Sequence, residues 1–198
     1  MNYKAIGELV EKARQQDGAA AEELYTLLSK SLYYYALRML NNSEDAMDAL
    51  QETWISFYSN IHNIKKADAT VAYLKRTMHN HCLKILRKGG NFVSYEDSDD
   101  LDLEYGYGEQ EDFLPEGFVL NRERDQKLSE LVSRLPEAQR SVVILHYYDQ
   151  LSAREIADIL SVAEAAVYNR LSRARGAMRQ WCNELLESEV SEKCHQMN

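Results

Sequence analysis

Residues 135–181 read LPEAQRSVVILHYYDQLSAREIADILSVAEAAVYNRLSRARGAMRQW, and this stretch decides the fold of the second half of the chain. Pro136 suits the first turn of a helix, where a missing backbone N–H costs nothing. Asp149 ends the apolar run that follows. Ser152 and Glu155 have the spacing of a capping box, which predicts the start of a second, short helix.

A third helix follows a turn at residues 161–163. Its apolar residues recur about every 3.5 positions, which predicts one buried side. They are Val167, Leu171, Ala174, Met178, Trp181 and Leu185. A short capped helix, a tight turn and a longer helix with an arginine-bearing face are the outline of a helix-turn-helix, whose second helix enters the major groove. The same pattern also fits a plain helical hairpin with a solvated basic face.

The segments LPEAQR, ILHYYDQLSAREIADILSV and VYNRLSRARGAMR are similar, nearly position by position, to region four of bacterial sigma factors, especially the extracytoplasmic-function (ECF) type. The resemblance implies a reader of the minus-thirty-five promoter element. The residues that it assigns to this DNA are Tyr168, Asn169, Arg170, Arg173 and Arg175.

Three residues depart from the family's usual pattern in this region. Ser161 stands where Gly is usual, and a positive φ there would strain a serine. Ala166 and Tyr168 replace polar residues where base edges are usually read, which removes hydrogen-bond donors. The arginines that the resemblance assigns to phosphate contacts, Arg170, Arg173 and Arg175, match the family's pattern. The resemblance therefore predicts binding to the minus-thirty-five element but leaves its base preference open.

The formal net charge of −9 over 198 residues is the wrong sign for a lone DNA-binding protein. Residues 91–121 explain it, because they contain ten acidic residues and no Lys or Arg. The rest of the chain then carries about +1. A self-repelling segment of this kind is expected to be extended and flexible. It resembles the linker between regions two and four of sigma factors, and its several aromatic and leucine residues predict that part of it docks.

The N-terminus has no unbroken apolar core, so it does not resemble a signal peptide. No later run approaches the roughly 20 apolar residues of a membrane span, which predicts a cytoplasmic protein. The three cysteines, Cys82, Cys182 and Cys194, form no CxxC pair, so neither a disulfide framework nor a zinc ribbon is indicated. We expect no cofactor and no metal.

The helix expected over residues 44–61 has two opposite faces. At about 100° per residue its large apolar side chains fall on one side and its carboxylates on the other. The acidic face could be solvated, could dock a basic partner, or could share a divalent metal as in a nuclease. EDAMDALQETWISFY resembles the sigma region-two helix that docks on core RNA polymerase. This resemblance implies a core-polymerase-binding role for Asp45, Asp48, Gln51 and Glu52.

The helix expected over residues 68–87 pairs a core stripe with an exposed aromatic and basic face. Such a face suits single-stranded DNA, because bases stack on the ring and cations hold the backbone. AYLKRTMHNHCLKILRK resembles the part of sigma region two that reads the minus-ten element. Four residues depart from the family's pattern, namely Thr70, Tyr73, Thr77 and Lys84, whereas Arg76 and Asn80 match it. The residues implied in minus-ten DNA binding are Tyr73, Arg76, Asn80, Lys84 and Arg87.

Two histidines and a cysteine on the same helix also suggest a metal site. His79 and His81 fall about 200° apart on one helix, which argues against shared coordination. Cys82 is better interpreted as a core residue.

We therefore expect an all-α protein of two small helical domains joined by a flexible acidic linker. The expected ranges are a region-two-like domain at 1–88, the linker at 89–120, a region-four-like helix-turn-helix domain at 121–188 and a disordered tail at 189–198. The resemblance implies a non-enzymatic sigma factor that binds core RNA polymerase and promoter DNA and pairs with an anti-sigma protein. The alternatives are a stand-alone helix-turn-helix regulator and a metal-dependent nuclease. We also hypothesise that the acidic linker keeps the free protein off DNA until polymerase binds.

Overall fold

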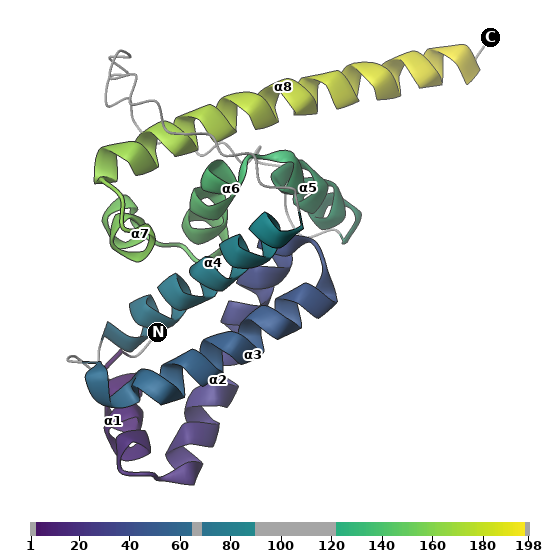
Figure 1. Ribbon diagram of the computed structural model, residues 1–198. Helices are drawn as coiled ribbons and strands as arrows, with labels where there is room; N and C mark the ends of the chain where they lie inside the picture. Colours follow the sequence, from purple (N-terminus) through teal and green to yellow (C-terminus); the bar gives the residue numbers. More distant parts are fainter. Residues whose placement is uncertain (1–2, 65–68, 90–121, 197–198) are drawn as a thin grey trace.

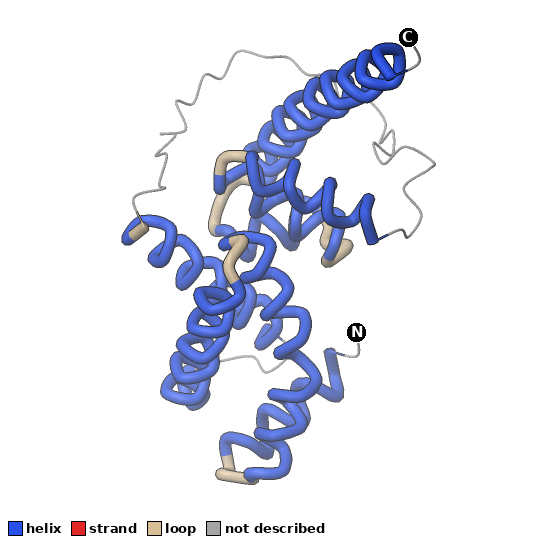
Figure 2. The backbone as a smooth tube through the Cα atoms, turned by 90° about the vertical axis from the view of Figure 1, so that its right-hand side faces the viewer, coloured by secondary structure: helices blue, strands red, loops and turns tan. Residues whose placement is uncertain are grey.

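The computed structural model describes residues 3–64, 69–89 and 122–196. Within these ranges every regular element is a helix, as Figure 2 shows, so the predicted all-α class is confirmed. The expected acidic linker, apart from Gly89, lies outside the described residues.

The first helical unit contains α1 (Tyr3–Arg14), α2 (Gly18–Leu40), α3 (Ser43–Asn60), a short 3-10 turn η1 (Ile61–Asn63) and α4 (Thr70–Lys88). Asp17 caps α2 by accepting hydrogen bonds from the backbone N–H groups of Ala19 and Ala20. Asn42 caps α3 in the same way. The predicted core stripes of α3 and α4 are buried, including Trp54, Phe57, Met78 and Cys82, except that Ile85 near the end of α4 is only partly buried.

The second helical unit contains α5 (Arg122–Arg134), α6 (Glu137–Val143), the π-helical turn η3 (Ile144–Tyr148), α7 (Ala153–Leu160) and α8 (Glu164–Gln196). The predicted capping box is present, since Glu155 accepts from the backbone and hydroxyl of Ser152 at 2.9 and 2.7 Å. These bonds lower the pKa of Glu155. Ser161 ends α7 with a φ of 58°. The turn therefore has the positive φ that, as noted from the sequence, strains a serine at this position.

The third helix is longer than the sequence predicted. A disordered tail was expected from residue 189, whereas the structure continues α8 to Gln196. The physical reason is composition, because no Gly or Pro follows Gly176 and the segment contains several strong helix formers. None of the helices in the described part of the chain is long and apolar enough to cross a membrane.

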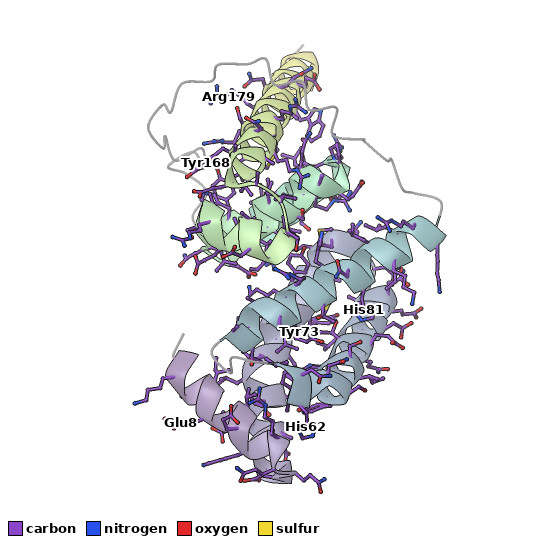
Figure 3. The ribbon with its side chains drawn as sticks, turned by 60° about the vertical axis from the view of Figure 1, so that its left-hand side comes forward. Glu8, His62, Tyr73, His81, Tyr168 and Arg179 are labelled. Carbon is purple, nitrogen blue, oxygen red and sulfur yellow. The ribbon has the colours of Figure 1, made fainter. Side chains whose placement is uncertain are left out.

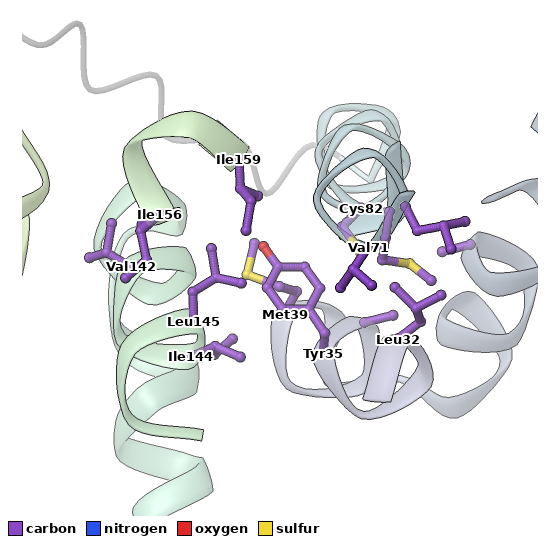
Figure 4. Packing of buried hydrophobic residues seen from close by; sticks show 14 of the residues in the cluster. Leu32, Tyr35, Met39, Val71, Cys82, Val142, Ile144, Leu145, Ile156 and Ile159 are labelled. Atoms are coloured by element: carbon purple, nitrogen blue, oxygen red, sulfur yellow. The ribbon is translucent and has the colours of Figure 1, made fainter. Parts of the chain in front are cut away.

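The two units pack against each other along α4, which lies between α7 and the rest of the first unit in Figure 1. Their buried residues form one continuous cluster. Figure 4 shows Leu145 and Ile159 of the second unit beside Tyr35 and Met39 of α2. The two helical units are therefore docked in this structure.

Candidate nucleic-acid and polymerase interfaces

The acidic face of α3 is positioned by the burial of its opposite side. Trp54 is held by an edge-to-face contact with Phe57, with ring centroids 5.5 Å apart, and by an indole hydrogen bond to Ser29 of 3.0 Å. This anchoring leaves Asp48, Gln51 and Glu52 exposed. Asp45 is half-buried and lines a polar cavity of about 500 Å³ between the two helical units.

Two exposed apolar residues belong to this surface and were missed by the sequence interpretation. Met47 is 42% exposed and Ile55 is 60% exposed. Both share a face with Gln51, because positions four apart lie one above the other on a helix. The sequence could have identified them, because both are apolar residues that fall outside the predicted buried stripe of α3. We call Met47, Asp48, Gln51, Glu52 and Ile55 the α3 surface.

The face of α4 opposite the core carries the residues that were expected to hold minus-ten DNA. Asn80, Lys84 and Arg87 are exposed. Tyr73 is half-buried, with its ring centroid 6.3 Å from that of Phe57. Arg76 is also exposed, but its guanidinium is hydrogen-bonded to the second unit, as described next.

Arg76 caps the last turn of α7. Its Nε donates to the carbonyl of Ile159 at 3.1 Å, and a terminal nitrogen donates to the carbonyl of Asp158. The last carbonyls of a helix lack intrahelical partners and lie at its negative end, so they attract a guanidinium. The structure therefore brings a predicted DNA-binding residue together with α7.

Three more contacts join the units, and the sequence interpretation missed them. Lys75 forms an ion pair with Asp149, and their side chains are 9% and 14% exposed. The Arg38 guanidinium stacks 4.0 Å from the ring centroid of Tyr148. Arg140 donates to the carbonyl of Met39 at 2.5 Å.

Lys75 alone gave a usable signal in the sequence. It falls on the same side of α4 as Val71 and Met78, so a charged residue interrupts a predicted buried stripe. A charge in that position is expected to have a partner.

The α8 face carries the residues expected to bind minus-thirty-five DNA. Tyr168, Asn169 and Arg173 are exposed, whereas Arg170 and Arg175 are half-buried. The Nε of Arg175 donates to the carbonyl of Leu171 on its own helix at 3.3 Å. Figure 3 shows Tyr168 on α8 in the second unit and Tyr73 on α4 in the first, so the two expected DNA sets lie on separate helical units.

The histidines of α4 point to different neighbours. His79 Nδ1 lies 2.9 Å from the hydroxyl of Tyr35, and His81 Nε2 lies 3.2 Å from Ser56 Oγ. Burial lowers the pKa of His79 to about 4, and the nearby charge of Arg170 contributes to the same shift. Burial raises the pKa of the Cys82 thiol to about 12, which agrees with its predicted core role. The described residues include no group of three or more His, Cys, Asp or Glu that could hold a metal ion.

Comparison with known families gives two matches in the order of the two helical units. Residues 14–92 match Sigma-70 region 2, and residues 125–178 match Sigma-70, region 4. The ECF RNA polymerase sigma factor SigW of Bacillus subtilis is 27% identical over 184 residues, which cover 91% of this chain and 98% of SigW. The ECF sigma-E factor of Salmonella typhimurium strain LT2 is 30% identical over 139 residues, covering 69% of this chain and 73% of that protein.

Solved structures show the same fold. CnrH, in complex with the cytosolic domain of CnrY, has a TM-score of 0.67 at 17% identity and covers 91% of this chain and 98% of its own. The sigma factor RpoE, in complex with the anti-sigma factor NepR from Bartonella quintana, has a TM-score of 0.61 at 20% identity. The match covers 82% of this chain and 96% of RpoE.

A region-two unit followed by a helix-turn-helix region-four unit defines a bacterial transcription initiation factor. The chain belongs to the ECF RNA polymerase sigma factors.

Proposed function

We propose that this sigma factor attaches to core RNA polymerase through the α3 surface. The observation that carries this proposal is the pairing of exposed Met47 and Ile55 with the carboxylates of Asp48 and Glu52 on one helix. Apolar side chains surrounded by charged ones are typical of a protein interface, in which the apolar centre is buried and the rim stays polar. The carboxylates would select a basic partner surface and speed its encounter.

Promoter DNA would bind through both helical units. The α4 residues Asn80, Lys84 and Arg87, with Tyr73 beside them, would hold the minus-ten strand by cationic contacts and stacking. The exposed α8 residues Asn169 and Arg173 would enter the major groove of the minus-thirty-five element. Opening the duplex costs a few kcal/mol per unstacked step, and these contacts would offset that cost. The chain itself would perform no chemistry and would act as a specificity subunit.

A protein inhibitor is the remaining partner that we propose. The related fold of RpoE is described in complex with the anti-sigma factor NepR, and that of CnrH in complex with CnrY. An analogous anti-sigma protein would regulate this chain. Because bacterial core polymerase and promoters are cytoplasmic, the sigma factor would act in that compartment.

Co-purification with bacterial core RNA polymerase tests the docking proposal. The wild type is expected to be retained, and an Asp48→Lys, Glu52→Lys double variant is expected to be lost. A Glu22→Lys, Glu23→Lys variant is the matched control, because it makes the same charge change at exposed positions of α2. If both variants are retained equally, the α3 surface is not part of the interface with core RNA polymerase. If the wild type itself is not retained, a stand-alone helix-turn-helix regulator becomes the better account.

A further inference from the structure

The guanidinium of Arg14 joins α1 to the turn that follows α3. Its Nε donates to the carbonyl of Ile61 at 3.0 Å, and a terminal nitrogen donates to the carbonyl of Ile64. The other terminal nitrogen pairs with Glu11 on the same helix at 2.5 Å. The Arg14 side chain is 17% exposed, so solvent screens these contacts only partly. One residue of α1 therefore holds the first residue of η1 and the residue that follows its last.

The two carbonyls suit a cation. Carbonyls at the end of a helix lack intrahelical partners and lie at its negative end, and η1 follows directly on α3. A guanidinium presents its donors in a rigid, planar fork, so two carbonyls bound to it are fixed relative to each other. Ile61 and Ile64 are buried. His62 and Asn63, which lie between them, are exposed. The turn is thus anchored at both ends and open in the middle.

α1 itself is fixed by the burial of one of its sides. Ile6 and Val10 are 1% and 0% exposed in the core of the first unit. α1 packs on α2, α4 and η1, and Figure 1 shows it at the end of the unit where α3 stops and α4 starts. The match to Sigma-70 region 2 begins at residue 14, so almost all of α1 lies outside the matched region. The contact with η1 is the feature of α1 that bears on the proposed function.

η1 lies next to the N-terminal end of the α4 face that was assigned to minus-ten DNA. Tyr73 is the first residue of that set along α4, and its ring contacts Phe57 near the end of α3. Ile61 follows Phe57 by one helical turn, which is about 6 Å along the axis. Figure 3 shows His62 and Tyr73 on the same helical unit. A strand that is held along α4 and continues past Tyr73 therefore reaches η1.

His62 and Asn63 bring hydrogen-bonding groups to this end of the face. An asparagine amide has donors and an acceptor, and an imidazole has two ring nitrogens, so both can bond to the edge of an unstacked base. Cationic and stacking contacts alone bind a single strand with little regard to sequence. Base preference therefore needs groups such as these two, held in a fixed position by supporting contacts.

We propose that Arg14 is a positioning residue that holds η1 at the N-terminal end of the α4 face, so that His62 and Asn63 read one base at the edge of the minus-ten element. The proposal rests on the proposed function, since it assumes that α4 binds the minus-ten strand. Arg14 acts through η1 and makes no contact with the DNA. Its loss costs base selectivity at one promoter position, whereas loss of a purely structural residue affects stability or all positions alike.

Selection of promoters by the holoenzyme tests the proposal. The full-length chain is assembled with bacterial core RNA polymerase and a promoter library randomised at the minus-ten element. The base preference at each position is then obtained from the sequences that are retained in open complexes.

Two controls accompany Arg14→Ala, which removes both carbonyl contacts. Glu11→Gln is the matched control, because it removes the partner of the ion pair and keeps the contacts to η1. Cys82→Ala is the stability control, because it removes a buried group from the same unit. Cys82 lies about 18 Å along α4 from the first residue of that helix, so the change is remote from η1.

In Arg14→Ala, the preference at one end position of the element is expected to fall at least about fivefold, the low end of the discrimination that one good base contact provides. The other positions should keep the wild-type preference. Arg14→Lys should restore part of the loss, because an ammonium can reach a carbonyl but lacks the rigid fork. Glu11→Gln and Cys82→Ala should keep the wild-type profile. An Arg14→Ala profile that equals the wild type, or that is reduced at every position, would overturn the proposal.

A His62→Ala, Asn63→Ala double variant keeps the test decisive if Arg14→Ala does not fold. Both positions are exposed, so the fold should tolerate the changes. The double variant is expected to lose preference at the same position as Arg14→Ala. The triple variant should lose no more, because groups that act through one another are not additive. Losses at different positions, additive losses, or no loss in the double variant would each contradict the positioning role.

The wild-type holoenzyme separates the two levels of failure. If it selects minus-ten sequences and Arg14→Ala leaves every preference unchanged, the positioning role is wrong and the proposed function stands. If the wild type forms no holoenzyme, or selects no sequence at any position, the proposed function fails and the positioning role fails with it.

Discussion

Lys75 of α4 and Asp149 at the end of η3 form a largely buried ion pair that joins the two helical units across 74 positions of sequence. Their side chains are only 9% and 14% exposed, so solvent and salt screen the pair weakly. If the units can separate, however, each charge regains water. Loss of one partner should therefore weaken docking more than it weakens the core of either unit.

Asp149→Asn is expected to uncouple the unfolding of the two units. Each unit contains one tryptophan, Trp54 in α3 and Trp181 in α8, so single-tryptophan variants report on them separately. With Asp149 in place the two urea midpoints should coincide, because docked units unfold as one cooperative system. In the Asp149→Asn background they should separate. Midpoints that stay together in that background would mean that this pair does not couple the units.

The elements of both units could be predicted from sequence because their signals are local. Ser152 and Glu155 form the expected capping box, and the stripe from Val167 to Met178 is buried as its spacing predicted. These features depend on neighbours three or four positions apart, which the sequence displays directly. The exposed carboxylates of the α3 surface followed from the same reasoning.

The docking of the units could not be predicted, because it depends on partners far apart in the chain. Helical periodicity places the charge of Lys75 on the buried side of α4 but does not identify its partner. From the sequence, Asp149 was interpreted only as the end of a helix. Arg76 was assigned to an open face, and periodicity alone does not show that the end of α7 accepts its hydrogen bonds. An apolar stripe predicts that one face of a helix is buried, but it does not identify the helix that packs against that face.

Replacing Ser161 with glycine is expected to stabilise the second unit. Ser161 has a φ of 58°, a left-handed conformation that costs a residue with a Cβ more than it costs glycine. The greater freedom of glycine in the unfolded chain offsets part of the gain, so we expect about 0.5–1 kcal/mol in the free energy of unfolding. Urea denaturation measures it. Ser161→Ala is the control and should give no stabilisation. If alanine stabilised the protein as much as glycine does, relief of backbone strain would not be the cause.

Acid is expected to destabilise the fold through His79. Its pKa is lowered from 6.5 to about 4, mainly because the ring is buried against Tyr35. Between these values the unfolded chain binds the proton more readily than the folded one. The contribution of His79 is therefore complete above pH 6.5 and is lost as pH falls toward 4, by up to about 3 kcal/mol.

A non-titrating replacement isolates this effect from the carboxylates, which also titrate in acid. His79→Gln keeps an amide that can bond the Tyr35 hydroxyl, and its unfolding free energy should fall less steeply with acid than that of the wild type. His62→Gln, at an exposed position in η1, is the control and should retain the wild-type slope. Parallel pH profiles for wild type and His79→Gln would show that His79 is not the acid-sensitive group.

Arg173 is expected to contact a phosphate of the minus-thirty-five element. It is exposed on α8, in the row of residues that a helix-turn-helix presents to DNA. Arg173→Ala in the holoenzyme should weaken duplex binding to a similar degree across sequences, and the slope of log affinity against log salt should become shallower by about one unit. Arg134→Ala removes an exposed arginine from α5 and should leave the slope unchanged. A sequence-dependent loss with an unchanged slope would assign Arg173 to base recognition, whereas no loss would place it off the DNA.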